Sequence, residues 1–334
     1  MKNKIIQQMK KIFAFILLII SFSCGKQIEE VIVEKKVEKI VKVDPKVKSE
    51  STIAYYFEEQ KSILTNKKQN QSFITIDWYE NELFLGVEAI NGKNKTYSIQ
   101  KLDLQTGQLT ELISNLKEIK DVAINNDYLF VTQLNTIQVF NRKTYSLHTV
   151  IGSGTEGYRN NGMFQALALL PMEDYFLVRD LRRLLFYRNS DITPENSKRI
   201  SAPVRSAFYQ RSNASLAHIG KKLYLSNGTS IETYDLQENM LINNEQTVSR
   251  NINFGTRIYQ LVHFRGHLYA SFGELGFARI DTEKGMIGRK YTGFQSKPIN
   301  VTCLTFSEDK LFAINNVDGS VVIYDVKNII YKEY

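Results

Sequence analysis

Residues 73–84 read Phe-Ile-Thr-Ile-Asp-Trp-Tyr-Glu-Asn-Glu-Leu-Phe: a short apolar strand, a polar turn, and a second strand that opens with an aliphatic-aromatic pair. Such a pair, in either order, returns five more times at intervals of 43 to 47 residues. The six pairs are Leu83-Phe84, Leu129-Phe130, Phe176-Leu177, Leu223-Tyr224, Leu268-Tyr269 and Leu311-Phe312. A repeat of this length holds four short strands and their turns, which together form one blade of a β-propeller. The sequence therefore predicts an all-β, six-bladed propeller.

A second landmark supports four antiparallel strands in each blade. Ten to twenty residues after most pairs comes another strand that closes on Asp, and Asp suits the turn that follows. These strands end at Asp103, Asp235, Asp281 and Asp325, with Asn141 as a variant. The innermost strands are then predicted at residues 73–78, 122–125, 166–170, 215–219, 259–264 and 301–306.

The propeller is predicted to span residues 52–334, with no insertion large enough for a second domain. Two segments are candidates for the strand that completes the ring. The apolar, aromatic segment 52–57 precedes the first blade, and residues 329–334 follow the last one. Closure matters because an open sheet edge is a template for aggregation.

One repeat has a more specific resemblance. A Gly-rich loop at residues 151–162 ends in Asn161-Gly162 and is followed by Ala166, Pro171 and Asp180. This pattern resembles the NHL repeat of six-bladed propellers, although Ala168 replaces the usual Phe. Arg182-Arg183 also replaces the usual Asn-His or Asn-Arg step. The resemblance implies a six-bladed ring and does not imply a ligand.

The N-terminus predicts where the protein is located. Four lysines precede an apolar run at residues 12–22, and Cys24 follows. This arrangement resembles a bacterial lipoprotein signal, with Ser21 at the position where Leu is usual. The alternative is a transmembrane anchor, but the run is shorter than the roughly 20 residues that a membrane span needs. The resemblance implies a signal peptide at residues 1–23, acylation of Cys24 and stable anchoring through the acyl chains.

The segment between signal and propeller, residues 24–51, is rich in Lys, Glu and Val and lacks aromatic residues. This composition predicts a flexible tether, with an amphipathic helix as the alternative. The other cysteine, Cys303, falls on an innermost strand. We expect it to be a buried structural thiol, because no neighbouring cation lowers its pKa.

Net charge does not identify the partner. The formal charge is +8, and four of the lysines lie in the predicted signal, which leaves about +4 for the mature chain. This modest excess does not indicate nucleic acid, and it fits anionic lipid headgroups or an acidic protein surface.

The candidate partner-binding site is a basic and aromatic rim around the third blade. Arg combined with aromatic residues is typical of binding hot spots, and solvated loop arginines are the alternative interpretation. The rim comprises Tyr158, Arg159, Arg179, Arg182, Arg183, Arg205, Phe208, Tyr209 and Arg211. The loops that carry these residues are predicted to share one face of the ring.

Signals for catalysis are few. Propeller enzymes use carboxylates, Asn or His that point into the central channel. The inner strands offer Asp77, Asp121, Asn125 and His218, and we predict no metal site or cofactor. The spacing of His263 and His267 places them in a hairpin, where we expect a solvated turn.

Two hypotheses remain. The first is a non-enzymatic, lipid-anchored scaffold of the cell envelope that holds another envelope protein. It is similar in plan to the propeller lipoprotein of the outer-membrane barrel-assembly machinery, although that family usually has eight blades. The resemblance implies an outer-membrane location facing the periplasm and barrel-assembly components as partners. The alternative is a divalent-ion-dependent propeller enzyme, of the lactonase or sugar-dehydrogenase type, with its site in the channel.

Overall fold

The protein is described by a computed structural model, which covers residues 54–63, 65, 67–152, 154, 163–181, 183–193, 204–205, 215–237, 250–294 and 297–329. Residues 55–329 form one compact unit that contains every strand of the ring. Within the described part of the chain the secondary structure is almost entirely β, with one short 3-10 helix, η1 (Asn189–Asp191). No helix in these ranges is long and apolar enough to cross a membrane.

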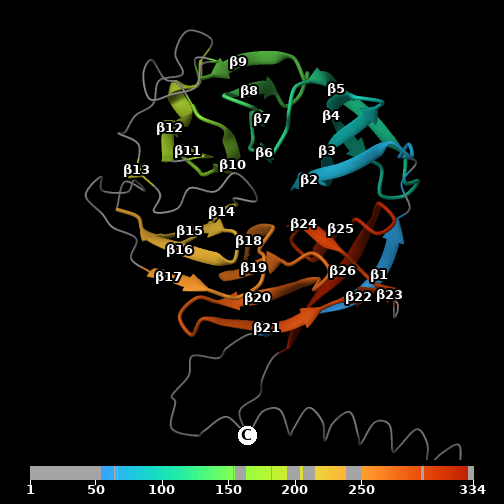
Figure 1. The fold of residues 1–334 in the computed structure, drawn as a ribbon, viewed down its shortest axis with the longest axis vertical. Helices are drawn as coiled ribbons and strands as arrows, with labels where there is room; N and C mark the ends of the chain where they lie inside the picture. The colour runs from blue at the N-terminus through green and yellow to red at the C-terminus, as the bar shows by residue number, and fades with distance from the viewer. Residues whose placement is uncertain are drawn as a thin grey trace, which may run out of the picture. The chain divides into compact units, whose positions relative to one another are not determined.

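The strands form six sheets of four strands each, arranged around a common centre (Figure 1). Blade 1 contains β2 (Gln71–Tyr79), β3 (Glu82–Asn91), β4 (Asn94–Leu102) and β5 (Leu109–Leu116). Blade 2 contains β6 (Val122–Ile124), β7 (Tyr128–Gln133), β8 (Thr136–Asn141) and β9 (Leu147–Ile151). Blade 3 contains β10 (Ala166–Pro171), β11 (Tyr175–Asp180), β12 (Arg183–Arg188) and β13 (Val204–Arg205).

Blade 4 contains β14 (Leu216–Ile219), β15 (Lys222–Asn227), β16 (Ser230–Asp235) and β17 (Arg250–Asn253). Blade 5 contains β18 (Gln260–Phe264), β19 (His267–Ser271), β20 (Phe277–Asp281) and β21 (Met286–Tyr291). Blade 6 contains β24 (Val301–Phe306), β25 (Lys310–Asn315), β26 (Ser320–Ile329) and β1 (Ala54–Ile63). A small hairpin, β22 (Gly293–Phe294) and β23 (Lys297–Pro298), lies between blades 5 and 6 in the chain. The predicted all-β propeller of six four-stranded blades is confirmed, and the innermost strands agree with prediction to within about two residues.

The recurring hydrophobic pair has a simple role in the packing. Successive side chains on a strand point to opposite faces of the sheet, so the two members of a pair contact different neighbouring blades. In blade 2, Leu129 belongs to the apolar cluster shared with blade 1, whereas Phe130 belongs to the cluster shared with blade 3. The same division holds for the other five pairs. The hydrophobic core is therefore divided among six junctions between adjacent blades, and each repeat supplies one residue of its pair to each junction.

Aromatic stacking adds to two of these junctions. Phe130 stacks on Phe176 across blades 2 and 3, with ring centroids 4.2 Å apart. Trp78 stacks on Phe312 across blades 1 and 6, with ring centroids 4.7 Å apart. Such pairs are worth about 0.5–1.5 kcal/mol beyond the apolar area they bury.

The N-terminal strand closes the ring. β1 lies beside β26 as the outermost strand of blade 6, so residues 54–63 supply the strand for which the sequence left two candidates. Phe57 is 6% exposed and meets the rings of Tyr269, Phe277 and Tyr291 edge-on, with centroids 5.5, 5.3 and 5.0 Å apart. An aromatic cluster around Phe57 therefore holds the closing strand β1 in place.

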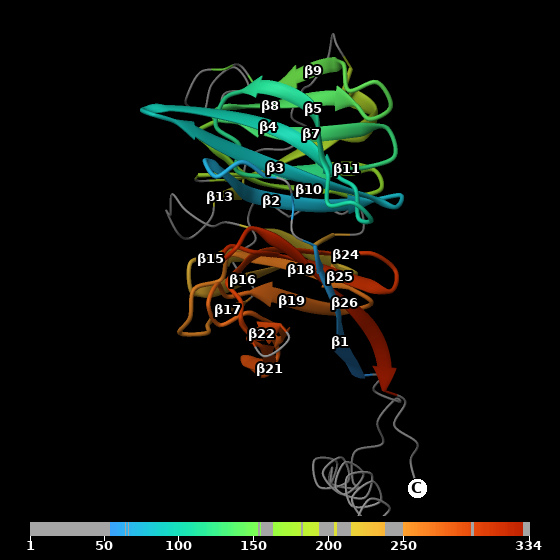
Figure 2. The same ribbon diagram turned by 90° about the vertical axis from the view of Figure 1, so that its right-hand side faces the viewer.

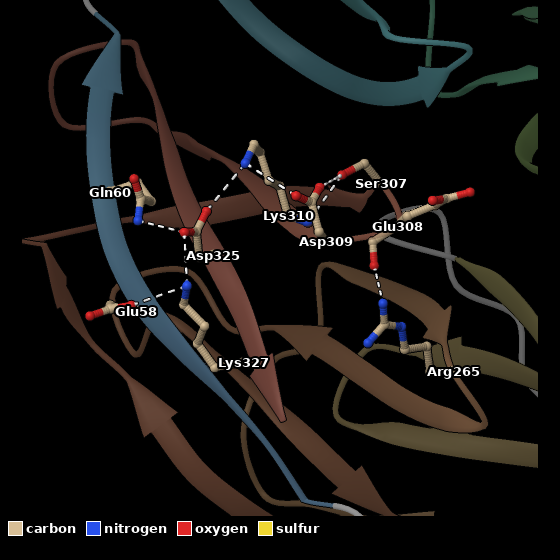
Figure 3. A network of polar contacts seen from close by, with 9 residues as sticks. All are labelled: Glu58, Gln60, Arg265, Ser307, Glu308, Asp309, Lys310, Asp325 and Lys327. Atoms are coloured by element: carbon tan, nitrogen blue, oxygen red, sulfur yellow. Dashed lines mark hydrogen bonds and ion pairs between the residues drawn. The ribbon is translucent and has the colours of Figure 1, made fainter. Parts of the chain in front are cut away.

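A polar network on blade 6 joins the same strands (Figure 3). Asp325 of β26 accepts a hydrogen bond from Gln60 Nε2 of β1 at 2.6 Å. It also forms ion pairs with Lys310 and Lys327, each at 3.3 Å. Lys327 reaches back to Glu58 of β1 at 3.6 Å. These groups are solvent-accessible, so the network adds little stability compared with the aromatic cluster.

Candidate functional site

The central channel is a cavity of about 250 Å³ bounded by the innermost strand of every blade. β2, β6, β10, β14, β18 and β24 surround it (Figure 1). Its polar lining includes Asp77, Asp121, Ser215, His218, Gln260 and His263. Asp77, Asp121 and His218 therefore lie where the sequence placed them. Asn125 is not in the lining, because its Oδ1 accepts hydrogen bonds from the N–H groups of Asp127 and Tyr128 in the next turn, at 3.0 and 2.8 Å.

Asp77 bonds to the backbone of the next blade. Its Oδ1 accepts a hydrogen bond from its neighbour, Trp78 N–H, at 2.8 Å, and its Oδ2 accepts one from Ile124 N–H of blade 2, at 3.0 Å. Burial raises the pKa of Asp77 to about 7, against the effect of these hydrogen bonds. The negative charge of Asp121 raises the pKa further. Asp77 therefore exchanges its proton near neutral pH while holding two blades together.

Asp121 joins three blades. Its Oδ1 accepts hydrogen bonds from Thr75 Oγ1 of blade 1 at 3.1 Å and from Val122 N–H at 2.9 Å. Its Oδ2 accepts the N–H of Leu169 in blade 3 at 2.9 Å. Burial raises the pKa of Asp121 to about 6 despite these three donors. Both channel carboxylates thus have their oxygens engaged by the fold.

The Asp121 contact is one of a series at a single level of the innermost strands, which we call the polar belt. Five blades carry a side chain that bonds to the next blade at this level: Thr75 to Asp121 Oδ1 (3.1 Å), Asp121 to Leu169 N–H (2.9 Å), Ser215 to Leu261 N–H (3.0 Å), Gln260 to Leu304 N–H (2.7 Å) and Cys303 to Ile74 O (3.1 Å). Ala168 occupies the corresponding position in blade 3. The polar belt therefore links every pair of adjacent blades except blades 3 and 4.

Cys303 is the buried structural thiol that the sequence predicted. It is 7% exposed and unpaired with other cysteines. Burial raises its pKa to about 12, so the sulfur remains a neutral thiol that donates to the carbonyl of Ile74. Cys303 acts as a hydrogen-bond donor between blades and not as a nucleophile.

Two histidines meet at the channel wall, and only one of them was predicted to line it. The rings of His218 and His263 lie 6.2 Å apart, since both residues occupy the same register position in neighbouring blades, opposite Leu223 and Leu268. Burial lowers the pKa of each, and the proximity of His263 lowers that of His218 further. The sequence spacing instead predicts that His263 lies with His267 in a solvated turn. Superposing the repeats on their hydrophobic pairs would have placed it beside His218.

The channel residues do not assemble a recognisable metal centre. Within the described ranges there is no group of three or more His, Cys, Asp and Glu side chains arranged to hold a metal ion. His263 Nε2 instead accepts a hydrogen bond from Gly266 N–H at 3.0 Å. The channel offers two proton-exchanging carboxylates that bond across blades, and a pair of imidazoles whose rings lie 6.2 Å apart across blades 4 and 5.

The predicted rim around blade 3 is only partly described. Tyr158, Arg159, Arg182, Phe208, Tyr209 and Arg211 lie outside the described residues, as does Cys24, and Arg205 is described only as part of the backbone of β13. Arg179 and Arg183 are 2% and 0% exposed. Both side chains are buried in the protein, so neither guanidinium is available to contact a partner as predicted.

Arg183 is held by a buried carboxylate. Its Nε and Nη2 donate to Asp180 Oδ2 at 2.9 and 2.6 Å, and its backbone N–H donates to Oδ1 at 2.7 Å. The guanidinium also lies over the ring of Phe164, 5.2 Å from its centroid. Asp180 is the residue that matched the end of the NHL-like pattern, and its role here is to fix the turn between β11 and β12.

Arg179 belongs to the junction between blades 3 and 4. Burial lowers its pKa, and attraction to the fully buried Glu232 of β16 opposes that effect most strongly. Glu232 in turn accepts hydrogen bonds from Tyr234 Oη at 2.6 Å and Asn227 Nδ2 at 3.2 Å. Opposite charges therefore lie inside the one junction that lacks a polar-belt contact.

Comparison with known proteins adds little to this geometry. No family model matches the chain, and neither does any curated protein. Among solved structures, the chain is similar to the computationally designed Ika8 protein, with 13% sequence identity over 76% of this chain and 71% of that one and a TM-score of 0.43. At that level the likeness carries no information about function.

Proposed function

We propose that this protein is a lipid-anchored scaffold of the cell envelope, which holds a protein partner on a rigid six-bladed ring. The observation that carries the proposal is the use of the channel carboxylates. Asp77 and Asp121 spend their oxygens on backbone N–H groups of neighbouring blades, so the polar groups most suited to catalysis serve to fix the ring. A rigid ring presents its surface at little entropic cost, which favours binding.

The N-terminal sequence supports the location. The lysines, the apolar run and Cys24 resemble a lipoprotein signal, and the proposed site is the outer membrane, facing the periplasm. A direct test is metabolic labelling with an alkyne analogue of palmitate in a bacterial host. Wild type and Cys303→Ala should incorporate the label, and Cys24→Ala should not. Label retained by Cys24→Ala would contradict the anchor.

The partner is proposed to be another envelope protein, and an accessory role in outer-membrane protein assembly is the specific form of the proposal. The test is purification of the tagged, lipidated protein in mild detergent after brief cross-linking, followed by mass spectrometry. Stoichiometric recovery of an outer-membrane barrel or its assembly factors supports the proposal. Recovery of the monomer alone, with cross-linking shown to be efficient, contradicts it.

A channel enzyme is the second candidate, and one observation favours it. Asp77 has a pKa of about 7 beside a cavity of about 250 Å³, and a general acid or base needs a pKa near neutrality. A divalent-ion-dependent lactonase or sugar dehydrogenase would retain bound calcium after dialysis and would lose activity in Asp77→Asn. Absence of both bound calcium and turnover on lactone and sugar panels would exclude this candidate.

A further inference from the structure

The meander of each blade divides its turns between two faces of the ring. Turns between the first and second strands, and between the third and fourth, lie on one face. Turns between the second and third strands lie on the other, together with the connections to the next blade. We call the second the middle-turn face. In the described residues it is formed by turns at 91–94, 134–135, 228–229, 272–276 and 316–319 and by connections at 67–70, 117–121, 254–259, 292–294 and 297–300.

The opposite surface is the terminal face. It is formed by the turns between first and second strands, at 80–81, 125–127, 172–174, 220–221, 265–266 and 307–309, and by the described turns between third and fourth strands, at 103–108, 142–146 and 282–285. β1 starts on this face, because it leads into β2 through the connection on the middle-turn face. β26 ends on it, because it leaves the turn at 316–319 and runs the other way. In Figure 2 the start of β1 and the arrowhead of β26 lie side by side. Both ends of the ring therefore lie on the terminal face.

The middle-turn face combines exposed apolar side chains with positive charge. Val317 is 68% exposed at the turn of blade 6, and Ile90, Leu134 and Leu275 are 43%, 40% and 41% exposed at or beside the equivalent turns of three other blades. Exposed cations surround them: Lys68, Lys93, Lys117, Lys120, Arg257 and Lys297. The acids on this face are fewer: Glu274 and Asp318 are exposed among the described turn residues, and the partly exposed Glu118 forms an ion pair with Lys120 at 2.5 Å.

The terminal face carries more exposed acids than the middle-turn face does. Four of its six turns between first and second strands carry exposed carboxylates, at Glu80, Asp127, Glu173, Asp174, Glu308 and Asp309. The terminal face also carries exposed cations and two exposed apolar side chains, so the two faces differ in the balance of charge and not by a complete separation. These residues are Lys143, Lys221, Lys222, Arg265, Lys284, Leu147 and Met286. Charge that is arranged in this way steers a partner of opposite sign and sets the orientation in which it docks.

We propose that the middle-turn face is the docking surface for a protein partner with an acidic surface, which pairs with the lysines and receives the apolar turn residues. This inference rests on the proposed scaffold function and specifies its surface. A protein is favoured over the bilayer because the chain that leads to the proposed anchor leaves from the terminal face. A partner on the middle-turn face therefore does not compete with that chain for the same surface.

The first experiment uses the purified full-length protein in detergent and labelled poly-L-glutamate as the probe, at an ionic strength of about 0.1 M, where the Debye length is about 10 Å. The test variant reverses three cations of the middle-turn face, Lys93→Glu, Lys117→Glu and Lys297→Glu. The control variant makes the same change in charge on the terminal face, at the exposed residues Lys143→Glu, Lys222→Glu and Lys284→Glu. We expect the test variant to weaken binding by about tenfold or more and the control by no more than about twofold, because local complementarity outweighs net charge within a Debye length. Equal losses in the two variants would overturn the proposal.

Two further measurements address other occupants. Phosphatidylglycerol vesicles that bind wild type more tightly than poly-L-glutamate, and lose binding in the test variant, would assign the face to lipid and overturn the proposal. Sedimentation that shows wild-type self-association, abolished in both variants, would assign the middle-turn face to contact with the terminal face of a second copy and would also overturn the proposal.

Recovery of the envelope partner separates this inference from the proposed function. A partner recovered by wild type and control but lost from the test variant supports both. Equal recovery by all three keeps the scaffold and refutes this docking surface. If no protein is recovered, the scaffold fails, and the poly-L-glutamate comparison still decides whether the face selects acidic polymers.

Discussion

The junction between blades 1 and 2 and the junction between blades 3 and 4 enclose similar apolar clusters but handle polar groups differently. In the first, Asp121 and Asp77 bond to neutral donors of the adjoining blade, and these carboxylates have pKa values of about 6 and 7. In the second, Ala168 replaces the belt residue, and the fully buried Glu232 lies opposite Arg179. The first junction can relieve its buried charge by taking up a proton, whereas the second depends on a balance of opposite charges.

The largest effect is expected when one of the two buried charges, Glu232, is removed. Glu232→Leu should lower the free energy of unfolding by about 3–5 kcal/mol, because it leaves the Arg179 guanidinium buried without its main opposing charge. The measurement is urea unfolding followed by circular dichroism. The matched control, Glu111→Leu, alters an exposed carboxylate on β5 and should change stability by less than about 0.5 kcal/mol.

A double variant sharpens the same test. Glu232→Leu combined with Arg179→Met replaces both charges with apolar groups and should recover much of the loss, since buried pairs exchanged for apolar residues are often neutral in stability. If the loss of unfolding free energy in the double variant equals the sum of the losses in the two single variants, the charges do not interact across this junction.

The second prediction concerns pH and the junction between blades 1 and 2. Because folding raises the pKa of Asp77 from 3.8 to about 7, the folded state binds the proton more tightly than the unfolded state does. Its contribution to stability is therefore greatest below pH 4 and is lost as pH rises toward and through 7. Between pH 5 and 8 it should reduce the free energy of unfolding by roughly 2–3 kcal/mol.

Asp77→Asn cannot titrate, so the stability of this variant should depend less on pH over that range. Asp103→Asn is the control. Hydrogen bonds from the N–H groups of Thr106 and Gln105 lower the pKa of Asp103, so it is ionised in both states above pH 5 and should leave the slope unchanged. A wild-type slope that survives Asp77→Asn unaltered would assign the titration to another group.

The third prediction concerns the polar belt at a neutral position. Ser215 Oγ accepts the N–H of Leu261 at 3.0 Å and donates to the carbonyl of the same residue at 3.3 Å. Ser215→Ala should cost about 1–2 kcal/mol, because it leaves these buried backbone groups without their partner. Ser114→Ala, at an exposed position on β5, should be neutral in the same thermal or urea assay. No loss in Ser215→Ala would mean that the belt is replaceable by apolar packing.

The smallest effect is expected where the ring closes. Gln60→Ala removes the hydrogen bond to Asp325 in the exposed network of blade 6 and should lower stability by no more than about 0.5 kcal/mol. The same measurement in 1 M salt should reduce the difference further. A loss of several kcal/mol would show that the polar network, and not the aromatic cluster around Phe57, secures the final strand.

The blades could be predicted from sequence because their signal is local and periodic. Each hydrophobic pair must serve two junctions, so the pattern survives even where the rest of the repeat has diverged, as at Phe176-Leu177. The identity of the closing strand could not be decided in this way. Both candidate segments contain aliphatic and aromatic residues, and the choice depends on which one fits the edge of β26 and the aromatic cluster of Tyr269, Phe277 and Tyr291.

The site was less accessible to sequence reasoning. Asp77 and Asp121 were correctly placed in the channel, but their bonds to the next blade depend on the rotation between blades, which a single repeat does not encode. The burial of Arg179 and Arg183 was missed because arginines in a variable loop read as solvated or partner-binding groups. Their buried acidic partners, Glu232 and Asp180, were visible only once the strands were paired.

The strand that completes blade 6 comes from the opposite end of the chain from its three companions, and this has a consequence in time. During synthesis β1 emerges before every other strand of the ring, yet its neighbour β26 appears only after blades 1 to 5. Blades 1 to 5 can form one after another, but the sixth must wait, with Phe57 lacking its enclosure until nearly the whole polypeptide is available. The nascent protein therefore carries an unpaired strand with the apolar side chains of Phe57 and Ile63 uncovered while the other blades form, and a factor that shields residues 54–63 in that interval would raise the yield of closed rings.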